Sequence, residues 1–155
     1  MISLILAGKV GSSIASEIGS MRVSEQIDAL EIMGVNSASF LILPKIIASM
    51  FFFPCLVILS MAIGMIGAWV GGLSVDVTTS DFLYGLQYEF VPFYVTYAII
   101  KTLFFAFLVS SISSYFGYHS KGGAISVGKS STEAVVYSSI FILVFNFILT
   151  KIILA

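Results

Sequence analysis

Charged side chains are scarce in this sequence. Of its 155 residues, 7 are Lys or Arg and 8 are Asp or Glu, so 10% are charged, whereas a soluble domain carries roughly 25%. Hydrophobic residues make up 59%, and the mean hydropathy is +1.10. Because so few charges cannot cover a surface in water, the composition excludes a soluble globular enzyme and a disordered chain. It is typical of a membrane protein.

Residues that bind metals or nucleic acids are also rare. The single cysteine, Cys55, excludes a disulfide scaffold and a cysteine-based metal cluster, and the single histidine, His119, leaves little for a His-ligated metal. The net charge is −1 and no basic stripe exists, so nucleic acid is excluded as a partner. Because the sequence contains no nucleophile–base pair or carboxylate dyad, we expect no catalytic residue, metal or cofactor.

The positions of the charges predict the membrane spans. A helix needs about 20 apolar residues to cross the roughly 30 Å hydrocarbon core. The stretch between Lys45 and Asp76 carries no charge, and the stretch between Glu89 and Lys121 carries only Lys101. We therefore predict an all-α polytopic membrane protein. Its three full transmembrane helices are expected over 46–72, 90–113 and 134–154.

The first residues, 1–19, have a different composition. They begin apolar and then become small and weakly polar, with Lys9 and Glu17 among them. This stretch is too short and too polar for a fourth independent span. We predict that it is the end of a further membrane helix, with small residues that let another helix approach closely.

The Lys and Arg residues predict the orientation in the membrane. Positive charges accumulate in cytoplasmic loops. They occur within 1–45 and 114–133, whereas the charged residues of loop 73–89 are all acidic, Glu89 among them. We therefore place 20–45 and 114–133 in the cytoplasm and loop 73–89 outside.

The cytoplasmic segment 20–45 contains a short amphipathic helix. Ser24 is expected to cap its N-terminus and Gly34 to end it. Its apolar stripe consists of Val23, Ile27, Leu30 and Gly34. The helix either rests on the bilayer surface or docks a soluble partner. Its acidic polar face favours a protein partner, because membrane-surface helices favour Lys and Arg there.

Residues Gly123 to Ser130 match the phosphate-loop pattern G-x-x-x-x-G-K-[ST]. That pattern binds nucleotides only in the context of a parallel sheet, and here it lies between two expected spans. Ser130 and Glu133 instead form a capping box before an apolar run. We therefore expect the last membrane helix to begin there, and interpret the match as coincidental.

Lys101 lies near the middle of the second expected span, where a charge is costly and often marks a pathway. Either it contacts an anionic lipid headgroup or pairs with a carboxylate such as Glu17, or it extends toward an interface without a specific role. With Tyr97 and Phe104, it forms the candidate lipid pathway.

The run LILAGKVGSSIASEIGSMRVSEQIDALEIMGV, from Leu4 to Val35, closely resembles the signature of MlaE-type permeases. A second run, KGGAISVGKSSTEAVVYSSIFILVFNFILT, resembles the glycine loop and last span of this family. Members are the membrane subunits of ABC transporters that move phospholipids between membranes of double-membraned bacteria and plastids. They are longer than this chain, so the resemblance implies that an amino-terminal part is missing.

The resemblance implies a single permease domain over 1–155, in a bacterial inner membrane or a plastid envelope. It makes Glu25 to Leu30 the coupling helix, docked in a groove of a separate ABC ATPase subunit. The implied coupling residues are Glu17, Arg22, Glu25, Gln26, Asp28 and Leu30. Because the partner hydrolyses ATP, this chain is not expected to be an enzyme.

Further partners follow from the same resemblance. Two copies of the chain would enclose a cavity for a phospholipid, with a periplasmic MCE-domain lipid carrier above loop 73–89. A STAS-domain protein would bind the ATPase. The alternative is a truncated or inactive membrane scaffold derived from such a permease. An ion-coupled carrier is disfavoured, because it would need internal repeats and several buried ionisable groups.

Overall fold

The computed structural model describes residues 1–88 and 90–154, and every element in it is a helix. Glu89, which we expected in the outer loop, and Ala155 lie outside the described residues. The chain is an all-α polytopic membrane protein, as the sequence predicts. The elements are α1 (Ile2–Leu6), the π-helical segment η1 (Ala7–Gly11), α2 (Ser12–Val23), α3 (Gln26–Ile32), α4 (Ser37–Leu73), α5 (Thr79–Tyr88), α6 (Pro92–Tyr118) and α7 (Ala124–Leu154).

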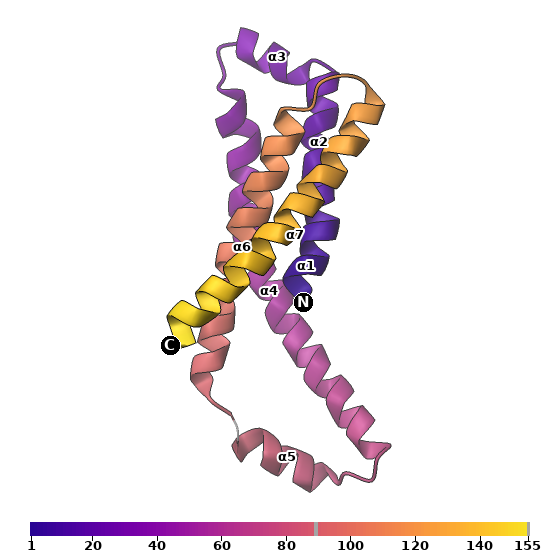
Figure 1. The fold of residues 1–155 in the computed structure, drawn as a ribbon, viewed down its shortest axis with the longest axis vertical. Coiled ribbons are helices and arrows are strands. Elements are labelled where there is room, and N and C mark those ends of the chain that lie inside the picture. Colours follow the sequence, from indigo (N-terminus) through magenta and orange to yellow (C-terminus); the bar gives the residue numbers. More distant parts are fainter. Residues whose placement is uncertain (89, 155) are drawn as a thin grey trace.

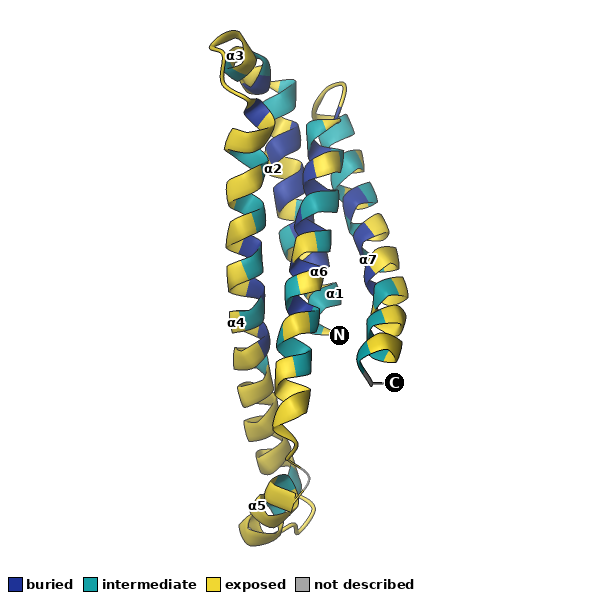
Figure 2. Cartoon of the chain, turned by 90° about the vertical axis from the view of Figure 1, so that its left-hand side faces the viewer, coloured by how far each residue is buried: buried dark blue, intermediate teal, exposed yellow. Residues whose placement is uncertain are grey.

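The long helices form an elongated bundle with α3 at one end and α5 at the other (Figure 1). Helix α6 is central, because it packs against α2, α4 and α7. Small residues make this close packing possible. A Cβ atom added at Gly117 of α6 would lie 2.7 Å from the backbone oxygen of Ala15 in α2. Burial is concentrated in the α3 half of the bundle, whereas the α5 half of α4 is exposed (Figure 2).

Four helical stretches are long and apolar enough to cross a membrane: Ile2–Val23, Ser37–Leu73, Pro92–Tyr118 and Ala124–Ile153. The first one extends past the expected bounds of 1–19, because α1, η1 and α2 follow one another as a 22-residue helical stretch. Its small residues pack against α6 and α7, and this packing offsets their weak hydrophobicity. The expected spans over 46–72, 90–113 and 134–154 fall almost wholly within α4, α6 and α7.

The last helix begins earlier than the capping box predicts. Helix α7 starts at Ala124, so Ser130 and Glu133 lie inside it and do not cap it. The chain turns at Gly122, whose φ is +116°, and the Glu133 carboxylate instead lies 3.9 Å from the Lys129 ammonium one turn earlier. The segment matching the phosphate-loop pattern is therefore helical from Ala124 onward.

Candidate functional site

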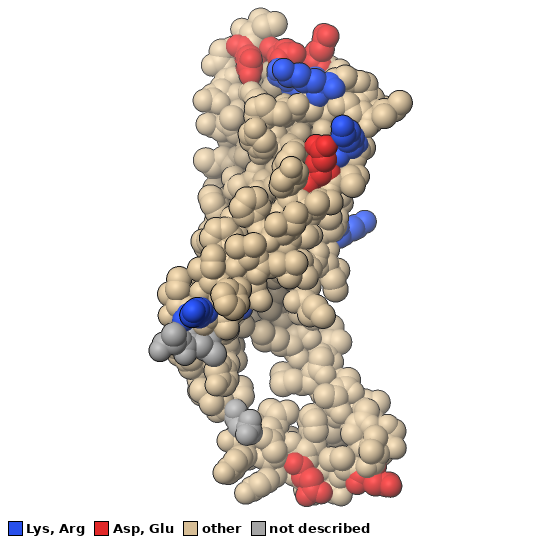
Figure 3. Space-filling view, in the orientation of Figure 1, with Lys and Arg blue, Asp and Glu red and all other residues tan. Residues whose placement is uncertain are grey.

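Charged side chains gather at the α3 end of the bundle (Figure 3). On the face shown, the α5 end carries acidic side chains alone. The α3 end combines Arg22 at the end of α2 with Glu25, Asp28 and Glu31 in and before α3. The α3 end of the bundle is therefore the candidate functional site.

The start of α3 differs from the prediction. Ser24 is not its cap, because the Ser24 hydroxyl donates back to the Ser20 carbonyl of α2 at 2.9 Å. Glu25 precedes the first helical residue instead, with a left-handed φ of 60° that turns the chain sharply. The predicted end is confirmed: Gly34 has φ +78°, and the Val35 N–H donates to the Leu30 carbonyl at 3.1 Å.

The apolar stripe of α3 faces the bundle of its own chain. Ile27 is fully buried in a cluster with Ile14 and Ile18 of α2, and Leu30 is half-buried. The chain itself thus covers much of this stripe, and docking of Glu25 to Leu30 on an ATPase stays a prediction. The stripe is covered because the short helix folds back over α2 and α4 and packs against their apolar side chains.

The opposite face of α3 is exposed and partly apolar. Ala29 and Ile32 of α3 are exposed at a spacing of three, which places them on one face of the helix, and Glu25 and Met33, which flank the helix, are also exposed. Ile32 is 87% exposed and Met33 is 67% exposed. We call these four residues the outward face of α3.

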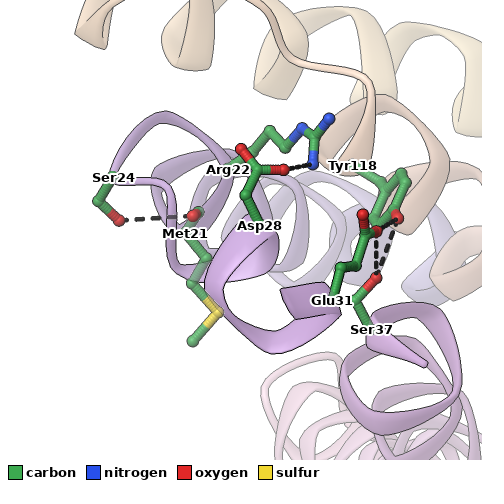
Figure 4. Close-up of polar contacts among 7 residues, drawn as sticks. All are labelled: Met21, Arg22, Ser24, Asp28, Glu31, Ser37 and Tyr118. Atoms are coloured by element: carbon green, nitrogen blue, oxygen red, sulfur yellow. Dashed lines mark hydrogen bonds and ion pairs between the residues drawn. The ribbon is translucent and has the colours of Figure 1, made fainter. Parts of the chain in front are cut away.

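An ion pair fixes α3 to the end of α2. The Arg22 guanidinium donates to Oδ1 of Asp28 at 2.6 Å, and its central carbon lies 5.6 Å from the ring centroid of Tyr118 in α6 (Figure 4). Of the predicted coupling residues, the structure thus brings Arg22 and Asp28 together. Their contact holds the first turn of α3 in register with α2.

A second polar contact joins α3 to both α4 and α6. Oε1 of Glu31 accepts hydrogen bonds from the hydroxyls of Ser37 and Tyr118, each at 2.9 Å, and these hydroxyls lie 3.0 Å apart (Figure 4). The Ser37 hydroxyl, then the Tyr118 hydroxyl and the positive charge of Arg22, lower the pKa of the Glu31 carboxyl below its usual range. We call Glu31, Ser37 and Tyr118 the clasp.

The clasp was not predicted from the sequence. Tyr118 and Glu31 are 87 residues apart, and no local pattern links them. Ser37 carried the only usable signal, because a serine after a glycine turn often begins a helix. Here Asn36 takes the capping position, with its side-chain oxygen accepting from the Ser39 N–H at 3.3 Å.

Glu17 and Lys101 do not pair with each other. Glu17 of α2 instead binds Lys45 of α4, with 2.5 Å between Oε2 and Nζ. The Lys101 ammonium contacts the Tyr97 hydroxyl at 2.7 Å and the Thr150 hydroxyl of α7 at 2.8 Å. The expected pairing of Lys101 with Glu17 is therefore wrong, because each residue has a nearer partner.

The three candidate lipid-pathway residues all lie on α6. Tyr97 and Lys101 form a polar link to α7, because the Tyr97 hydroxyl also donates to Thr150 at 2.9 Å. The Phe104 ring packs against Phe145 of α7, with 5.3 Å between centroids. The structure thus brings Tyr97 and Lys101 together, and it places Phe104 at the same helix pair.

Comparison with known proteins gives a consistent picture. A family model described as Permease MlaE matches residues 1–152. The chain is 42% identical over 152 residues to a probable ABC transporter permease protein of Rickettsia bellii, a match that covers 97% of this chain and 59% of the relative. A probable ABC transporter permease protein of Synechocystis is 36% identical, with 97% and 57% covered. The chloroplastic protein TRIGALACTOSYLDIACYLGLYCEROL 1 of Arabidopsis thaliana is 34% identical, with 96% and 43% covered. The chain thus spans less than two thirds of the length of these relatives.

Proposed function

Because this chain belongs to the MlaE permease family, we propose that it is the membrane subunit of an ABC transporter that moves phospholipids between membranes. Relatives named as ABC transporter permease proteins support the transporter class. In this proposal a separate ATPase subunit hydrolyses ATP, and the chain itself supplies the membrane path. The bacterial inner membrane is the proposed location, and the chloroplastic relative supports a plastid envelope as the equivalent.

The outward face of α3 is the observation that carries the proposal. It presents two large apolar side chains, Ile32 and Met33, on a helix that lies at the end of the bundle. Glu25 and Gln26 are exposed beside them. An apolar patch with a charged rim on one helix is the pattern of helix-in-groove recognition. We therefore assign the groove of the ATPase to this face.

The remaining coupling residues act through internal contacts in this proposal. Arg22 and Asp28 hold α3 on α2, while Glu17 joins α2 to α4 through Lys45. The half-buried side chain of Leu30 lies on the side of α3 that faces the bundle. Movement of the ATPase would then reach α2, α4 and α6 together, because the clasp connects the last two with α3.

We propose that the carrier and the second copy of the chain bind to parts of the molecule other than α3. Helix α5 lies at the far end of the bundle, with the exposed rings of Tyr84 and Tyr88 stacked at 6.2 Å between centroids. We assign this end to a periplasmic MCE-domain carrier. A second copy of the chain would complete the phospholipid cavity, with Lys101, Tyr97 and Phe104 along the path, and a STAS-domain protein would bind the ATPase.

Co-purification tests the docking assignment. The chain is expressed with its candidate ATPase subunit as wild type, as Ile32→Asp and as Met33→Asp. A matched control is Val75→Asp, because Val75 is 75% exposed in the turn that follows α4. We expect each α3 variant to lower the recovered ATPase at least tenfold and the control to leave it unchanged. Full recovery with both α3 variants would refute docking on this face.

A further inference from the structure

A narrow groove runs between the N-terminal helical stretch and α4. Its volume is about 230 Å³. The buried side chains of Ile14, Ser49 and Phe53 form its floor. Along its open side lie the exposed residues Ala48, Phe52 and Leu56. The π-helical segment η1 borders it through Val10, and such wider turns often occur at functional sites.

The shape of the groove fits a single extended chain. Its α4 residues run along one face from Lys45 to Leu56, which is about 16 Å at 1.5 Å per residue. A volume of about 230 Å³ spread over that length leaves a slot much thinner than a helix, which is roughly 10–12 Å wide with its side chains. A hydrocarbon chain fits this slot.

The groove is polar at one end and apolar beyond it. The Lys45 ammonium and the Glu17 carboxylate meet beside the end nearest α3, with side chains 20% and 55% exposed. Among the described residues that line the groove, Ser49 is the one polar side chain besides Lys45, and its hydroxyl donates to the Ile46 carbonyl at 2.8 Å. The part beyond Lys45 is therefore lined by apolar surface.

The charged end lies just beneath the depth expected for lipid headgroups. Lys45 is eight residues from Ser37, the first residue of α4, and thus about 12 Å from the α3 end of that helix. Phe52 and Leu56 lie about 10–16 Å deeper. With α3 at the membrane surface and a headgroup layer roughly 5–8 Å thick on each side, the backbone of Lys45 lies about 5 Å inside the hydrocarbon core. Its long side chain can extend back to the headgroups, and the apolar lining lies deeper in the core.

We propose that this groove binds one acyl chain of a zwitterionic phospholipid from the leaflet on the α3 side. The lipid phosphate contacts Lys45, and the ammonium group of the headgroup contacts Glu17. An adjacent pair of opposite charges complements a headgroup that carries both, through charge-assisted hydrogen bonds. A headgroup with a negative charge alone would meet repulsion from Glu17. The inference takes from the proposed function only the placement of α3 at a membrane surface, and it requires neither ATP hydrolysis nor transport.

Photocrosslinking of the full chain tests the groove. The chain is placed in vesicles containing phosphatidylethanolamine with a photoreactive acyl chain, and the labelled peptides are identified by mass spectrometry. We expect adducts on the peptides that contain Val10 and Phe52. Ala48→Trp fills the groove and should lower this labelling at least fivefold. The control Ala62→Trp places the same side chain at an exposed position of α4 outside the lining, and should leave the labelling unchanged.

The headgroup assignment is tested in the same vesicles. Photoreactive phosphatidylglycerol should label these peptides at least threefold less than phosphatidylethanolamine does, and Glu17→Gln should remove that difference. Ala48→Leu, a smaller filling substitution, serves as the test if Ala48→Trp does not give a monodisperse protein. Equal labelling in the Ala48 and Ala62 variants would refute the groove, and equal labelling by both lipids would refute the zwitterion. Either result would leave the docking of the ATPase on α3 untouched, just as loss of that docking would leave the labelling untouched.

Discussion

Tyr118, the last residue of α6, donates a hydrogen bond of 2.9 Å to the carboxylate of Glu31 in α3. Ser37, the first residue of α4, donates to the same oxygen at the same distance. One carboxylate thus joins three helices at the end of the bundle. Because α6 is the helix against which α2, α4 and α7 pack, the contact connects a short surface helix to the centre of the molecule.

Tyr118→Phe tests the clasp through its pH dependence. The pKa of Glu31 is lowered, so the carboxylate stabilises the folded state above its unfolded pKa of about 4.3, and this stabilisation is lost as the pH falls through the lower folded pKa. Removing the Tyr118 hydroxyl should raise the folded pKa of Glu31. We expect the variant to have a lower Tm at neutral pH and the difference from wild type to shrink below about pH 4. Thermal unfolding at several pH values measures this, and a difference that does not vary with pH would contradict it.

Truncation of two isoleucines of α3 should change the stability of the protein by very different amounts. Ile27→Ala removes a fully buried side chain and should cost about 2–5 kcal/mol of stability. Ile32→Ala truncates an exposed one and should change stability by less than about 0.5 kcal/mol. Only the second variant should weaken ATPase association without altering the Tm. Unfolding curves and co-purification of both variants test this, and equal destabilisation would show that the inward orientation of the stripe is wrong.

Gly117→Ala should separate α6 from α2. The new Cβ would lie 2.7 Å from the Ala15 carbonyl oxygen and 3.0 Å from Cβ of Ile18, and backbone atoms cannot give way cheaply. Overpacking of this kind costs about 1–3 kcal/mol. Gly67→Ala is the matched control, because no atom within the described part of the chain lies within 4 Å of its added Cβ. We expect a lower Tm for the first variant alone, and an unchanged Tm in both would contradict the close helix approach.

Cysteine labelling tests the predicted orientation. In a Cys55→Ser background, Ile125→Cys and Val75→Cys place thiols at positions that are 92% and 75% exposed, at opposite ends of the bundle. Because positive charges flank the first position and acidic ones the second, a reagent that cannot cross the membrane should label only Val75→Cys from outside. Labelling of Ile125→Cys in sealed cells would reverse the topology.

The sequence predicts the helices better than their ends. Stretches with no charge or with Lys101 alone located α4, α6 and α7, because burying a charge in hydrocarbon is costly wherever it occurs along a helix. The ends depend on single hydrogen bonds instead. Ser24 and Ser130 both precede helix-forming runs, yet one hydroxyl turns back to the preceding helix, and the other residue lies inside a helix that begins at Ala124.

The partners of the site residues could not be predicted for a related reason. The periodicity of α3 correctly groups Ile27 with Leu30, but it cannot say whether that face meets the same chain or another protein. Likewise, Glu17 and Lys101 are two charges of opposite sign in apolar surroundings, which makes them plausible partners. The choice of Lys45 for Glu17 depends on which helix lies beside α2, and that is a property of the tertiary packing.

The length of α4 has a consequence for the outline of the protein above the membrane. Its 37 residues extend for about 55 Å, and the bilayer with its headgroups is about 40–45 Å thick. An upright α4 would carry α5 about 10 Å past the far headgroups, and a tilt of about 40° would bring it level with them. Between these limits, α5 lies close to the lipid surface. A partner in the water would therefore meet the described part of this chain at the level of the headgroups.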